Sequence, residues 1–62
     1  MTKEIKTQLI NKCKELITSN NKRMILSSAH KFFNKANVSE DNEDKHFLME
    51  LYRLLFNKGM ML

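Results

Sequence analysis

The sequence has few of the residues with which small domains form stabilising disulfide bonds or metal sites. Its 62 residues include a single cysteine, Cys13, so no internal disulfide can form. Its possible metal co-ligands, His30 and His46, show no spacing typical of a zinc site. A domain of this length buries only about 60% of the surface that its unfolded chain exposes. We therefore expect its stability to depend on association with another molecule.

Proline is absent and glycine occurs once, at Gly59. One glycine cannot build a glycine-rich phosphate-binding loop. A chain without proline and with 29% charged residues is typical of compact helical structure rather than disorder. No apolar run approaches the ~20 residues that would cross a bilayer. A lone cysteine and no secretory leader predict a cytoplasmic location.

Acidic residues are scarce in the first part of the chain. Residues 1–37 carry eight basic and two acidic side chains, whereas residues 38–62 carry three basic and five acidic ones. The net charge is +4, and the basic part is compatible with nucleic acid or an acidic protein surface. The alternative is a lysine-rich exterior that meets only solvent. Nine lysines and seven asparagines, both with A-rich codons, indicate an AT-rich genome, such as that of a low-GC bacterium, its phage or a plasmid.

What the sequence does contain is helical periodicity. Apolar residues recur at three- and four-residue intervals and predict an all-α, three-helix single domain over 1–62, with helices at about 3–18, 21–36 and 40–57. Thr2, Asn20 or Asn21, and Ser39 or Asp41 are the expected N-caps. We read the acidic segment 40–44 as helix capping, because carboxylates are favoured at the positive end of a helix dipole.

The second predicted helix has the most basic outer face. Opposite its apolar stripe lie side chains that can contact phosphates or base edges. They are Arg23, Ser27, His30, Lys31, Asn34 and Lys35. An ordinary solvent-exposed helix face has the same composition, so this face is the weaker of two candidate sites.

The third predicted helix has an apolar surface that spans roughly 220° of its circumference. One neighbouring helix cannot cover so wide a surface, so it requires two helices or a second molecule. We expect the helix to stop at Asn57–Gly59, with glycine in the left-handed conformation, and to be followed by an apolar tail. The predicted partner-binding residues are Met49, Tyr52, Phe56, Met60, Met61 and Leu62. The alternative is a tail that folds back and plugs the open end of the bundle.

Nothing in the sequence indicates catalysis. A helical domain of this size offers little concave volume for a substrate. Ser28 and His30 are two residues apart on a helix and would not face each other. Cys13 lies on a core stripe, where a thiol is usually inert. We expect no catalytic residue, metal site, cofactor, small-molecule substrate or membrane span.

Together these features predict a small, non-enzymatic regulatory or inhibitory protein that acts by stoichiometric protein–protein binding. Its partner would be a second copy, as a homodimer that forms a larger helical bundle, or a host protein. The competing expectation is a DNA- or RNA-binding regulator that uses the basic face of the second helix.

Overall fold

The computed structural model describes all 62 residues as three α-helices without a strand. Helix α1 spans Lys3–Ser19, α2 spans Lys22–Val38 and α3 spans Asn42–Met61. Two residues connect α1 to α2, and residues 39–41 connect α2 to α3. The predicted all-α, three-helix fold is confirmed. None of the helices has a stretch both long enough and apolar enough to cross a membrane.

Each helix starts where a local cap permits it. The side chains of Thr2, Asn21 and Asp41 accept hydrogen bonds from backbone N–H groups two or three residues further on. These bonds satisfy donors that have no partner inside a helix, which confirms the predicted N-caps. Asn20 is the C-cap that follows α1, and its φ of 55° places it in the left-handed region. Asparagine tolerates that conformation better than most residues, so the chain can turn at once into α2.

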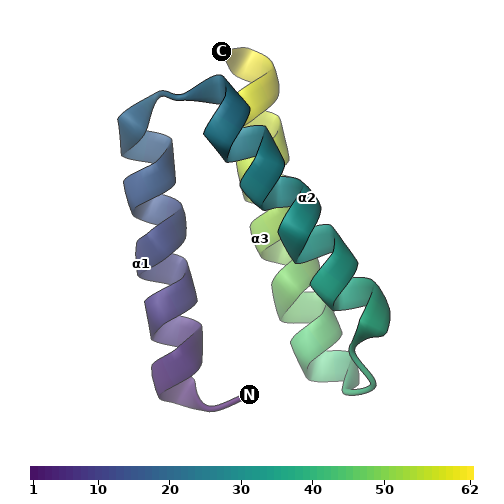
Figure 1. Cartoon of the computed structure of the whole chain (residues 1–62). Helices are drawn as coiled ribbons and strands as arrows, with labels where there is room; N and C mark the ends of the chain where they lie inside the picture. The colour runs from purple at the N-terminus through teal and green to yellow at the C-terminus, as the bar shows by residue number, and fades with distance from the viewer.

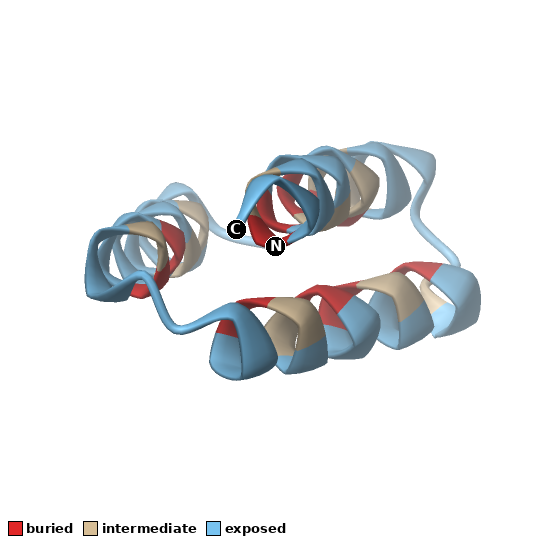
Figure 2. Ribbon diagram, turned by 90° about the horizontal axis from the view of Figure 1, so that it is seen from above, coloured by how far each residue is buried: buried red, intermediate tan, exposed pale blue.

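Helices α2 and α3 form a closely packed antiparallel pair, and α1 lies along one side of it with far fewer contacts (Figure 1). The pairing brings the buried stripes of all three helices together (Figure 2). The Met1 ammonium group also contacts Asp44 at 3.1 Å, and the Lys6 ammonium lies 5.5 Å from the centre of the Phe47 ring. The core residues are Cys13, Leu16, Ile25, Ala29, Phe32, Ala36, Leu48, Leu51 and Leu55.

The predicted helix stop at Asn57–Gly59 is wrong. Helix α3 continues through this segment to Met61, and Gly59 is buried with a helical backbone. Its role is a close approach of helices, because a Cβ built on Gly59 would lie 2.5 Å from Cδ2 of Leu26 on α2. Glycine is required here because it has no side chain, and not because the backbone turns in the left-handed conformation.

The alternative in which the tail folds back over the open end is also wrong. Met60 and Met61 continue the helical path of α3, and Leu62 closes it as the C-cap. The exposed fractions are 59% for Met60, 83% for Met61 and 47% for Leu62. The chain end therefore adds little to the core.

Candidate interaction surface

An apolar strip follows the side of the α2–α3 pair that α1 leaves uncovered. Helix α1 packs beside Ser28 and Phe32, as the small pocket between α1 and α2 indicates. Residues Leu26 and Phe33 lie on the opposite flank of α2, where they meet α3. We call this strip the apolar stripe, and its members are Leu26 and Phe33 from α2 and Met49, Tyr52, Phe56 and Met60 from α3.

Aromatic rings form the middle of the apolar stripe. The ring centroids of Phe33 and Tyr52 are 5.1 Å apart, and those of Tyr52 and Phe56 are 5.6 Å apart. Both pairs are tilted, within the range in which aromatic rings attract each other. Beside them a shallow groove of about 190 Å³ is lined by Leu26, Ala29 and His30 on α2 together with the last two rings.

The stripe is only partly covered by its own chain. Leu26, Phe33, Met49 and Tyr52 are half-buried, and Phe56 is 40% exposed. Leu26, Phe33, Tyr52 and Phe56 adjoin across the two packed helices, so their exposed area is continuous. Met49 and Met60 extend it along the same face of α3. A continuous apolar area with adaptable methionines at its ends is typical of a surface that binds another protein.

The six residues predicted for partner binding do not all lie together. Met49, Tyr52, Phe56 and Met60 follow each other at intervals of three, four and four residues and share one face of α3. Met61 is turned by about 100° from Met60, so it leaves the stripe. Leu62 lies beyond the last helical residue. The structure thus keeps four of the six in one surface and adds two residues of α2.

The two added residues, Leu26 and Phe33, belong by helical spacing to the apolar side of α2, together with the buried Ile25, Ala29 and Phe32. They lie at its edge, and the structure leaves them half-buried because α1 covers the other flank. The width of the apolar arc was the available signal. Which edge remained open depended on the side taken by α1.

The predicted basic face exists as a continuous outer surface of α2. All six of its residues are exposed, and none forms an ion pair with another side chain. His30 borders both this face and the groove of the apolar stripe. The two candidate surfaces therefore meet along one edge of α2.

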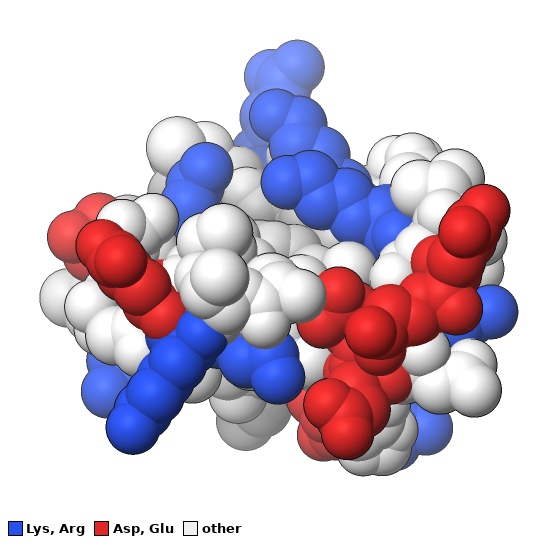
Figure 3. Space-filling view, turned by 90° about the horizontal axis from the view of Figure 1, so that it is seen from below, with Lys and Arg blue, Asp and Glu red and all other residues white.

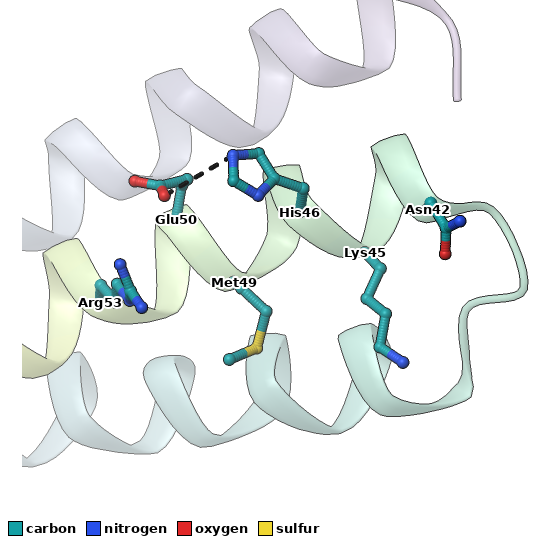
Figure 4. Close-up of a pocket in the computed structure, with 6 residues that line it drawn as sticks. All are labelled: Asn42, Lys45, His46, Met49, Glu50 and Arg53. Atoms are coloured by element: carbon teal, nitrogen blue, oxygen red, sulfur yellow. Dashed lines mark ion pairs between the residues drawn. The ribbon is translucent and has the colours of Figure 1, made fainter.

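The outer side of α3 carries an open depression of about 370 Å³ (Figure 4). Met49 and Lys45 point toward α2, whereas His46 and Glu50 point to the other side of α3. Nε2 of His46 and Oε1 of Glu50 are 3.8 Å apart, and both side chains are largely solvent-exposed. An exposed pair of this kind contributes little free energy and marks no enclosed site.

Cys13 is the one buried group with a shifted pKa. Its side chain is buried on α1, and this burial raises the pKa of the thiol, with a smaller opposing effect from Lys12. The thiol therefore stays protonated and a poor nucleophile at neutral pH. No group of three metal-ligating side chains comes together in the fold.

No protein-family model, curated protein or solved structure matches this chain.

Proposed function

We propose that the chain is a small, non-enzymatic regulatory or inhibitory protein of a bacterial, phage or plasmid system that acts in the cytoplasm by stoichiometric binding to another protein. The observation that carries the proposal is the apolar stripe. Leaving a row of aromatic and methionine side chains in water costs free energy, and a partner that covers them recovers it.

The position of the stripe supports this role. It lies on α2 and α3, the two best-packed helices, so its side chains are presented on a firm support. Aromatic residues fixed in this way are the usual anchors of protein interfaces. Phe56 is the anchor most open to a partner, because it combines a large ring with 40% exposure.

The test compares two exposed apolar residues of α3. Leu54 is 49% exposed and lies on a different flank from Phe56, so Leu54→Ser is a matched control for Phe56→Ser. Tagged versions of all three proteins are incubated with lysate of a low-GC bacterium at about 0.5 M salt. We expect a single protein in 1:1 ratio on the original chain and on the Leu54 variant, and its loss on the Phe56 variant. Equal retention by all three would refute the proposal.

A second candidate function is nucleic-acid binding by the basic face of α2. Its six exposed residues, free of ion pairs, are available to phosphates. Counterion release makes such binding weaken steeply with salt, whereas an apolar interface responds little. Titration of a labelled DNA or RNA duplex at about 50 and 200 mM salt distinguishes the two. Binding that falls by orders of magnitude and needs Lys31 would favour this candidate.

A further inference from the structure

The α2–α3 pair carries opposite charges at its two ends. Because the helices are antiparallel, Lys22 and Arg23 at the start of α2 lie at the same end as Lys58 near the end of α3. The other end holds the α2–α3 connection and the first turn of α3, where four of the five positions 40–44 are acidic, namely Glu40, Asp41, Glu43 and Asp44. Seen from the end of the molecule that carries this connection, the larger group of acidic side chains lies on one side and a smaller group on the other (Figure 3). The apolar stripe runs between the two ends.

The start of α2 carries positive charge and no acidic side chain to balance it. Its first turn has no acidic residue, and Lys22 and Arg23 add positive charge to the positive end of the helix dipole. Helix α3 shows the contrast, since Asp41 caps it and Glu43 and Asp44 lie in its first turn. The basic end of the pair would therefore be stabilised by carboxylates from outside the chain.

We infer that the apolar stripe binds a second copy of this chain, with the two α2–α3 pairs side by side and antiparallel. This arrangement has a two-fold axis, so each basic end meets the acidic end of the other copy and every contact occurs twice. Lys22 of one copy then lies level with Glu40 of the other. The midpoint between these positions along α2 is residue 31, beside the level of Phe33 and Tyr52.

The aromatic pair would therefore occupy the centre of the interface. Phe33 and Tyr52 already contact each other within one copy, at a centroid distance of 5.1 Å. Residue 31 is level with Leu54 on α3, because Leu26 lies beside Gly59 and Phe33 beside Tyr52. An antiparallel partner centred there sets Phe56 opposite Tyr52 and Met49 opposite Met60. The four helices of the two stripes form a bundle core, and the two α1 helices lie outside it.

Charge selects the antiparallel arrangement over a parallel one. In a parallel pair, the two Lys22–Arg23 ends would face each other, as would the two acidic connections, and like charges repel. Charge also favours a second copy over an unrelated amphipathic helix, because this chain itself presents both signs at the required separation.

Charge-reversal variants test the arrangement. One protein carries Lys22→Glu with Arg23→Glu, and another carries Glu40→Lys with Glu43→Lys; the capping residue Asp41 is left intact. The control carries Lys3→Glu with Lys14→Glu on exposed positions of α1, with the same change in net charge as the first variant. Molar mass is measured by light scattering at about 50 mM salt over a concentration series, with circular dichroism to verify folding.

We expect the original chain and the control to reach twice the 7.4 kDa of one copy. Each charge-reversed protein alone should dimerise about tenfold more weakly, and an equimolar mixture of the two should recover a heterodimer. Folded, monomeric original chain at millimolar concentration would overturn the inference. Mixing that restores nothing would overturn the antiparallel arrangement.

The inference rests on the proposed function in one respect, namely that the same stripe binds both the second copy and a target, so the two compete. Their failures are distinguishable. A monomer that still retains a lysate protein through Phe56 refutes the dimer and leaves the proposed function intact. A dimer for which no such protein is retained refutes the proposed function and leaves the dimer.

Discussion

Replacement of Gly59 by alanine tests the account of the α2–α3 crossing. The added Cβ would lie 2.5 Å from Cδ2 and 2.8 Å from Cγ of Leu26, whereas ordinary contact begins at 3.4 Å. Leu26 must therefore retreat by about 0.9 Å, and because its Cγ is involved, rotation of a terminal methyl group is insufficient. Overpacking of this kind costs about 1–3 kcal/mol. Alanine in place of glycine within a helix returns about 1 kcal/mol.

We therefore expect Gly59→Ala to lower the free energy of unfolding by up to about 2 kcal/mol. In a Leu26→Ala background the obstructing atoms are gone, so the same change should raise that free energy by up to about 1 kcal/mol. Urea unfolding followed by circular dichroism, at one low protein concentration, measures both effects. Asn57→Ala is the control, since it changes an exposed helical position near the end of α3. A stabilising effect of equal size in both backgrounds would refute the close-approach account.

Two further predictions concern the core. Leu55 is fully buried, whereas its neighbour Leu54 is 49% exposed. In urea unfolding, Leu55→Ala should therefore lower the free energy of unfolding by about 2–5 kcal/mol and Leu54→Ala by about 0.5 kcal/mol or less. Similar losses for the two variants would contradict the assigned core. The thiol of Cys13 should react with Ellman's reagent at pH 8 only as fast as the protein opens. Because burial raises its pKa above the ordinary 9.0, the unfolded thiol ionises first as the pH rises through 9, so the original chain should lose more stability there than Cys13→Ala; equal loss would contradict the assignment.

Features set by neighbouring residues were predictable from the sequence. The caps Thr2, Asn21 and Asp41 act on N–H groups two or three positions away, so their patterns carry the information. The buried stripes also followed from helical periodicity. The end of α3 did not, because the meaning of Gly59 depends on Leu26, 33 positions earlier in the chain. A glycine followed by apolar residues resembles a helix stop until its tertiary neighbour is known.

The candidate site shows the same division. Met49, Tyr52, Phe56 and Met60 share a face because their spacing is local. Met61 was predicted to belong to the same surface because the helix was expected to end before it. Helix α3 continues instead, and its turn directs Met61 away from that surface. The contribution of α2 to the stripe could not be predicted, since it depends on which flank α1 covers.

Helix α1 makes few contacts with α2 and α3, and this affects how the chain folds during its synthesis. The buried residues of α1, such as Cys13, are synthesised before α2 and α3. The residues that cover them include Leu55, which is 42 positions after Cys13. At a synthesis rate of about 5–20 residues per second, the apolar side chains of α1 remain exposed for roughly 2–8 s before Leu55 is made. Helices α2 and α3 are adjacent in the chain and can pair as soon as both exist. Helix α1 is therefore synthesised before the helices that cover it, whereas α2 and α3 can pair without it.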